Sequence, residues 1–248
     1  MSDAYSKIIL VTGANDGVGF EIAKQLAEKG HKVYVGARRE EAGKEAVAKL
    51  TQKGLDAHFL LLDVTNPESV KAAKELFEKE NDRLDVLVNN AGILCAFANP
   101  SEGDYKEYQR VFDTNVFGVI SVTTTFMPLI KKAKPGYGAV VNVTSGLGSN
   151  YHNATAEEGR RYNTANAYSV SKAALNSYTI GLANELRDQK IRVNCICPGL
   201  VKTKFNGYME AGKSPEDAGK LLVPWALLGP QDDDKTCQFY SNGEVRAW

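Results

Sequence analysis

Short apolar runs alternate with longer amphipathic segments along most of this chain. The apolar runs have the length of buried strands, and the longer segments repeat their apolar residues at helical spacing. Strands are expected at residues 7–12, 32–37, 57–62, 84–89, 137–144 and 191–197, with a seventh near 237–240. Helices are expected at residues 18–29, 40–53, 67–79, 105–132 and 167–188. This alternation predicts a doubly wound, parallel, seven-stranded sheet with helices on both faces.

Two polar, irregular segments interrupt the alternation, at residues 146–166 and 202–225. Each follows a predicted strand and therefore lies at the carboxyl edge of the sheet, where folds of this type bind ligands. The segments are predicted to be loops at the rim of an active site. The 248 residues suit one α/β domain, and no internal boundary is apparent.

Charge and apolar content exclude several classes of protein. Lys+Arg and Asp+Glu both number 30, which argues against a nucleic-acid surface spread over the domain. No apolar run approaches the length of a membrane span, and the first residues lack the pattern of a secretory signal. We therefore expect no membrane partner and a cytoplasmic location.

The four cysteines and three histidines lack the spacing of metal ligands. Small buried side chains are the favoured interpretation of the cysteines, with redox or metal use as the alternative. No metal is expected. The residues concerned are Cys95, Cys195, Cys197, Cys237, His31, His58 and His152.

A glycine-rich turn lies between the first predicted strand and the first predicted helix. Glycines there let the backbone approach a diphosphate, and the helix start offers free N–H groups. No Gly-Lys-Ser/Thr follows, so this is not the phosphate loop of a nucleotide hydrolase. The expected cofactor contacts are Gly13, Asn15, Asp16, Gly17, Val18 and Gly19.

The spacing of this turn, TGxxxGxG, resembles that of the short-chain dehydrogenase/reductase family. Further motifs match that family in the same order over almost the whole chain. They are Asp63-Val64, Asn89-Asn90-Ala91-Gly92, Ser145, Tyr168-Ser169-Val170-Ser171-Lys172 and Pro198-Gly199. Residues 36–39 and 238–241 look like the carbonyl reductase branch. The resemblance implies a single-domain Rossmann fold and an oxidoreductase that transfers hydride.

Tyr168 and Lys172 are four residues apart and therefore share one face of the predicted helix. A neighbouring ammonium is expected to lower the phenol pKa. The resemblance makes Tyr168 the proton donor and gives Lys172 the tuning of Tyr168 and the nicotinamide ribose. By the same resemblance, Ser145 binds the substrate oxygen and Asn115 holds a water in the proton relay. Tyr162 is a competitor, but Asn166 and not a lysine stands four residues after it.

The end of the second strand bears on the choice between NAD and NADP. Neutral Ala37 stands where NAD-using family members carry Asp, and Arg38 and Arg39 follow. A guanidinium suits a 2′-phosphate, so the sequence favours NADP(H), although both arginines are alternatively solvated loop charges. Acidic Asp16 stands where some NADP users carry a basic residue. The resemblance adds the contacts Asp63, Val64, Asn89, Ala91, Gly92, Pro198, Gly199, Val201 and Thr203, while Asn90 is alternatively a structural turn residue.

The expected substrate is a small hydrophobic ketone or aldehyde, because residues placed near the pocket are largely apolar. They are Leu94, Phe97, Leu147, Tyr151, Leu200, Phe205 and Trp225, and each is alternatively core or lid packing. Ketone or aldehyde reduction is the favoured activity. The alternatives are an NADP-dependent alcohol or steroid dehydrogenase working oxidatively and a non-catalytic dinucleotide sensor. A monomer, dimer or tetramer is compatible with the length of segment 146–166.

Overall fold

The computed structural model describes residues 5–155, 164–241 and 243–248. Its centre is one sheet with the strand order β3-β2-β1-β4-β5-β6-β7-β8. The strands are β1 (Ile8–Thr12), β2 (Lys32–Ala37), β3 (Ala57–Leu61), β4 (Val86–Asn89), β5 (Ala139–Val143), β6 (Arg192–Cys197), β7 (Phe239–Ser241) and β8 (Glu244–Arg246). The α-helices are α1 (Gly17–Glu28), α2 (Glu40–Thr51), α3 (Pro67–Glu78), α4 (Tyr105–Phe112), α5 (Gly118–Ile130), α6 (Asn150–Thr155), α7 (Asn166–Leu186) and α8 (Pro215–Ala226).

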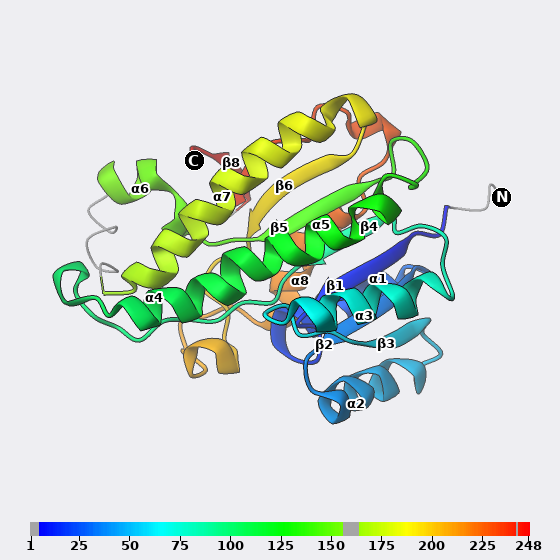
Figure 1. Ribbon diagram of the computed structural model, residues 1–248, viewed down its shortest axis with the longest axis horizontal. Helices are drawn as coiled ribbons and strands as arrows, with labels where there is room; N and C mark the ends of the chain where they lie inside the picture. Colours follow the sequence, from blue (N-terminus) through cyan, green and yellow to red (C-terminus); the bar gives the residue numbers. More distant parts are fainter. Residues whose placement is uncertain (1–4, 156–163, 242) are drawn as a thin grey trace.

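Helices cover both faces of the sheet, as predicted. The central strands are apolar at successive positions, so alternate side chains enter two different cores. Ile9 and Val11 join α1, α2 and α8, whereas Leu10 joins α3, α5 and α7. Figure 1 shows α3, α5 and α7 across the near face of the sheet, with α1 and α8 behind it. The doubly wound single domain is thus confirmed.

The predicted number of strands is wrong by one. Strands β1 to β7 pair in parallel, and β8 adds to β7 in the antiparallel direction. All three residues of β8 are exposed, so no apolar pattern marks this strand in the sequence.

The predicted helix over residues 105–132 is not continuous. A π-helical turn, Asp113–Phe117, separates α4 from α5. Such wide turns occur often at functional sites, because the extra residue redirects one side chain. Here the turn contains Asn115.

The two segments predicted to be rim loops contain helices. Residues 150–155 form α6, and the remainder of 146–166 lies partly outside the described residues. Within 202–225, Ser214 caps α8, which begins at Pro215 and packs against α1. Pro224 and Gly219 suggested a loop, but Pro224 falls in the last turn of α8 and Gly219 packs beside Gln25. The rim role is still a prediction for residues 202–214.

The direction of winding reverses between β1 and β4, which are neighbours in the sheet. Ligands of doubly wound sheets bind outside the carboxyl ends of the strands at such a switch point. The glycine turn follows β1 and the Asn89–Gly92 motif follows β4, so the topology brings these two motifs together. Among the described residues, no helix has both the length and the apolar character required to cross a bilayer.

Candidate active site

The glycine turn after β1 packs directly against the segment after β4. A Cβ on Gly13 would lie 2.9 Å from Ala91 Cα, and Gly13 has a φ of +61°. A Cβ on Gly19 would clash with Asn90 Nδ2 and lie 2.5 Å from Gly13 O. Glycine at both positions therefore lets the turn pack tightly within itself and against the segment after β4. The turn lies at the N-terminus of α1, where free N–H groups can bind a phosphate.

Thr12 and Asn90 hold the turn in place. The Thr12 hydroxyl accepts the backbone N–H groups of Asn90 and Ala91, both at 3.0 Å. Asn90 Nδ2 donates to the carbonyls of Thr12 and Gly13 at 2.9 and 3.1 Å. Asn90 therefore positions the turn. From the sequence alone, Asn90 is either a cofactor contact or a structural turn residue, and the role of Thr12 becomes visible only through the spatial pairing of β1 and β4.

The other predicted residues of the turn differ in their exposure and contacts. Asp16 caps α1 by accepting the N–H of Gly17 at 2.7 Å. Asn15 is half-buried, and Val18 packs against the core beneath α1. Gly17 faces Thr203, whose Cγ2 would lie 3.4 Å from an added Cβ. The segment after β6 thus reaches the glycine turn.

Tyr168 and Lys172 both lie on α7 and are 9 % and 4 % exposed. Lys172 Nζ lies 5.6 Å from the Tyr168 ring centroid and donates to Val143 O at 2.9 Å. Burial lowers the pKa of Lys172 to about 8. Burial also raises the pKa of the Tyr168 phenol above its ordinary value, and the Ser145 side chain is close enough to oppose this rise.

The pKa of Tyr168 is raised, which is the opposite of the lowering expected from the neighbouring ammonium. Burial is the largest cause of this rise, and the nearby Cys197 and Cys95 act in the same direction. Tyr168 is therefore a neutral phenol near pH 7. Tyr162, the alternative tyrosine, lies outside the described residues.

Asn115 is fully buried in the π-helical turn, facing the segment after β4. Its side chain accepts the N–H of Ile93 at 2.8 Å and donates to Ile93 O at 3.0 Å. Nδ2 also donates to Ser171 Oγ at 3.1 Å. A Cβ on Gly92 would lie 3.3 Å from Asn115 Oδ1 and 3.7 Å from Lys172 Nζ. The side chains of Asn115 and Lys172 therefore both lie close to Gly92. The structure thus brings Asn115 to the predicted catalytic residues.

Arg38 and Arg39 are exposed at the end of β2, next to the glycine turn. Ala14 N donates to Gly36 O at 3.0 Å, which ties the turn to this strand end. Neither arginine forms an ion pair with another described residue, and Arg39 gives α2 no side-chain cap. Free guanidinium groups beside an uncapped helix N-terminus can bind a phosphate.

The burial and contacts of three other predicted cofactor residues differ: these residues are Asp63, Val64 and Asn89. Asp63 is half-buried after β3 and accepts the N–H and the hydroxyl of Thr65 at 2.9 and 2.7 Å. Val64 is buried beside Gly118. Asn89 does not line a channel with its side chain: it is 2 % exposed and donates to Asn142 and Thr123 inside the sheet.

The chain matches the short chain dehydrogenase family over residues 7–214. The chain belongs to this family. Carbonyl reductase 1 (NADPH) of Mus musculus is 34 % identical over 277 residues, covering 97 % of this chain and 98 % of that relative. Cyclopentanol dehydrogenase of Comamonas testosteroni is 36 % identical over 229 residues, covering 92 % and 85 %. An NADPH-bound carbonyl reductase from chicken fatty liver has a TM-score of 0.83 at 27 % identity, covering 99 % and 100 %.

These relatives confirm the short-chain dehydrogenase/reductase family and its carbonyl reductase-like branch, and the chain is an oxidoreductase of this family. The described residues contain no cluster of three or more side chains arranged to hold a metal ion.

The predicted substrate residues separate into two groups in this dehydrogenase. Leu94 and Leu147 pack with Tyr168, and the Phe205 ring lies 5.8 Å from the Tyr168 ring, centroid to centroid. Leu200 is 41 % exposed on the same segment as Phe205. The structure does not bring the remaining three beside Tyr168. Phe97 and Tyr151 are exposed, and Trp225 is buried in α8 against Tyr240, so Trp225 is core.

The segment after β6 carries the last predicted cofactor residues. Pro198 is buried and Gly199 has a φ of +78°. Val201 forms a bridge to Lys213, and Thr203 begins a short helical turn capped by Asn206. Val201 and Thr203 are both buried, so this short-chain dehydrogenase holds them in a defined conformation.

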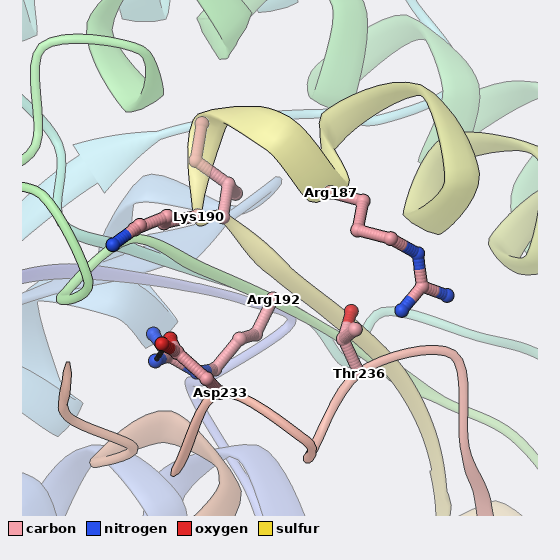
Figure 2. Close-up of a pocket in the computed structure, with 6 residues that line it drawn as sticks. Arg187, Lys190, Arg192, Asp233 and Thr236 are labelled. Atoms are coloured by element: carbon pink, nitrogen blue, oxygen red, sulfur yellow. Dashed lines mark hydrogen bonds and ion pairs between the residues drawn. The ribbon is translucent and has the colours of Figure 1, made fainter. Parts of the chain in front are cut away.

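A cavity of about 220 Å³ lies at the opposite edge of the sheet, near the start of β6. Figure 2 shows Arg187, Lys190, Arg192, Asp233 and Thr236 around it. The Arg192 guanidinium donates hydrogen bonds to the carbonyls of Asp232 and Gly136 and to the Asp233 carboxylate. None of the predicted site residues lines this cavity, so it is separate from the active site.

Proposed function

We propose that this protein is an NADP(H)-dependent reductase of small hydrophobic ketones or aldehydes. The observation that carries the proposal is the set formed by half-buried Ser145 and buried Tyr168, Lys172 and Asn115 at the carboxyl edge of the sheet, beside the glycine turn. NADPH, when bound, supplies the hydride. Tyr168, as a neutral phenol, donates its proton to the carbonyl oxygen, and Ser145 stabilises the charge that develops on that oxygen.

The cofactor preference is proposed from Arg38 and from the structural neighbours. Ala37 leaves no acid at the end of β2 to repel a 2′-phosphate, and the free Arg38 guanidinium is available to bind one. The neighbouring carbonyl reductase from chicken fatty liver is an NADPH complex. Apolar Leu94, Leu147 and Phe205 around Tyr168 favour a hydrophobic carbonyl compound.

Oxidation of an alcohol is the second candidate, because one relative is a cyclopentanol dehydrogenase. That direction requires Tyr168 to accept a proton as a phenolate. The same phenol that donates the proton in reduction accepts it in oxidation, so the position of Tyr168 suits either direction. The proposal of reduction relies on Arg38 and on the NADPH-bound structural neighbour.

The test is consumption of NADPH, followed by absorbance, with a panel of aryl and aliphatic ketones and aldehydes. Tyr168→Phe is expected to lower kcat by roughly 1000-fold or more while the Kd for NADPH changes less than about 3-fold. Tyr178→Phe is the matched control, since Tyr178 lies about 15 Å further along α7 by helix rise and packs in the core. Absence of turnover with every carbonyl compound favours a dinucleotide sensor, and turnover only with alcohols favours the oxidative activity.

A further inference from the structure

Cys197 connects two turns of the active site. It is the last residue of β6, immediately before the Pro198-Gly199 turn. Its Sγ accepts the backbone N–H of Gly146 at 3.1 Å and that of Gly199 at 3.3 Å. Gly146 directly follows Ser145, whereas Gly199 begins the segment that contains Thr203. One sulfur atom thus hydrogen-bonds to both turns.

The sulfur of Cys197 is buried, and a buried environment strengthens the hydrogen bonds that it accepts. Cys197 is 5 % exposed and packs with Cys195 and Phe239 in a small cluster of its own. Both hydrogen bonds are partly shielded from water, so an N–H that loses the sulfur acceptor destabilises the conformation of its turn, and each turn is held where the sulfur lies. Cys197 is also near enough to Tyr168 to affect the pKa of the phenol. The turns held by the sulfur therefore border the proposed proton donor.

We propose that Cys197 is a positioning residue of the active site, whose thiol sulfur fixes the Ser145 turn against the Gly199 turn. This inference rests on the proposed carbonyl reduction. Ser145 is useful only if its hydroxyl stays directed at the substrate oxygen, and small displacements of such a donor reduce the rate. Cys197 acts through Ser145 and does not itself touch the substrate.

Cys195 provides a matched control. It lies two residues earlier on β6, is fully buried in the same cluster and contacts Thr179 Oγ1 at 3.0 Å. Truncation of either cysteine removes one buried sulfur from this cluster, but only Cys197 contacts the two turns. The pair therefore separates a loss of packing from a loss of positioning.

Steady-state kinetics with NADPH and the best carbonyl substrate provide the first test. Cys197→Ala is expected to lower kcat about 5- to 20-fold with little change in the Kd for NADPH, because two hydrogen bonds are lost. Cys197→Ser keeps an acceptor and is expected to stay within about 3-fold of the wild type. Cys195→Ala is expected to stay within about 2-fold, at a similar loss of Tm.

A double-mutant cycle distinguishes action through Ser145 from a general defect. If Cys197 positions Ser145, Cys197→Ala has less than about a 2-fold further effect on kcat in a Ser145→Ala background. Additive effects in that background would overturn the proposal, as would equal losses of kcat in the two cysteine-to-alanine variants.

Amide hydrogen exchange tests the connection without turnover. Exchange at Gly146 and Gly199 is expected to be about 10-fold faster in Cys197→Ala and unchanged in Cys195→Ala. Unchanged exchange in Cys197→Ala would refute the role of the sulfur even if the enzyme reduces carbonyls. A wild-type protein that reduces no carbonyl would instead refute the proposed function, and the exchange rates would still decide whether the sulfur holds the turns.

Discussion

The buried ammonium group of Lys172 is expected to destabilise the folded protein. Its side chain is 4 % exposed, and burial lowers its pKa from 10.5 to about 8. At pH 7 lysine is protonated in both the folded and the unfolded chain, so the folded state carries the full unfavourable free energy of a buried ammonium. A pKa difference of this size corresponds to ~3 kcal/mol.

Lys172→Met is therefore expected to stabilise the cofactor-free protein at pH 7. Methionine keeps the length of the side chain and removes the charge, while the hydrogen bond to Val143 O, worth ~1 kcal/mol, is lost. The net gain is ~2 kcal/mol, or roughly 4–8 °C in Tm for a domain of this size. Turnover is expected to fall by orders of magnitude, because the proposed ribose-binding ammonium is gone.

The difference in the free energy of unfolding between Lys172→Met and the wild type is expected to depend on pH. Above pH 8 the folded wild type releases the Lys172 proton, whereas the unfolded chain keeps it up to about pH 10.5. The contribution of Lys172 to wild-type stability therefore rises between these values, and the advantage of Lys172→Met shrinks to near zero by about pH 9.5. Urea unfolding of both proteins from pH 7 to 9.5 measures this difference, in which other titrating groups cancel.

Lys7→Met is the control for the same substitution at another buried lysine. Lys7 has a pKa of about 8 for the same reason, burial, but donates to the carbonyls of Tyr137, Ala226 and Leu228. Its replacement leaves three acceptors without a donor, so Lys7→Met is expected to destabilise the protein. The reasoning is refuted if Lys172→Met is no more stable than the wild type at pH 7, or if the difference does not vary with pH.

Three further substitutions test the cofactor and substrate sites. Gly19→Ala is expected to raise the KM for NADPH at least about 10-fold, since its Cβ would clash with Asn90 and displace the turn; an unchanged KM would show that cofactor binding does not depend on this tight packing. Arg38→Ala is expected to reduce the preference for NADPH over NADH in kcat/KM by about 10- to 100-fold, and an unaltered ratio excludes Arg38 from binding the 2′-phosphate. Phe205→Ala is expected to raise KM several-fold for aryl ketones but not for NADPH, because the ring packs on Tyr168; equal KM values place Phe205 outside the substrate site.

The sequence predicts the sheet well because each central strand is apolar on both sides. Leu10 and its neighbours Ile9 and Val11 enter different cores, and such continuous apolar runs separate clearly from the amphipathic helices around them. The order of motifs then located the site, since the glycine turn, the Asn89–Gly92 motif, Ser145 and the Pro198-Gly199 turn each follow a strand at the carboxyl edge. The structure brings Tyr168, Lys172 and Asn115 together there.

Tertiary contacts explain the features that the sequence does not reveal. Helix α8 contains Gly219 and Pro224, which signal a loop locally, and it is stable because its apolar face packs on α1. The π-helical turn depends on Asn115 reaching the backbone of Ile93, a contact between segments 22 residues apart. The burial of Asn89 likewise depends on neighbours from other strands.

The buried polar row beneath the site fixes where the strands end. Asn89, Asn142 and Cys195 are paired across β4, β5 and β6, so they form one row of the sheet. Asn89 Nδ2 donates to Asn142 Oδ1 at 2.8 Å, Asn142 Nδ2 donates to Thr179 Oγ1 at 2.8 Å, and Thr179 Oγ1 lies 3.0 Å from Cys195 Sγ. A shift of one residue would turn these groups to the other face and leave them unpaired in an apolar core. The hydrogen bonds of Asn142 therefore hold the register of β4 against β5 and, through Thr179, the position of α7, whereas the Cys195 thiol at the end of the row is a weak partner that these strands do not depend on.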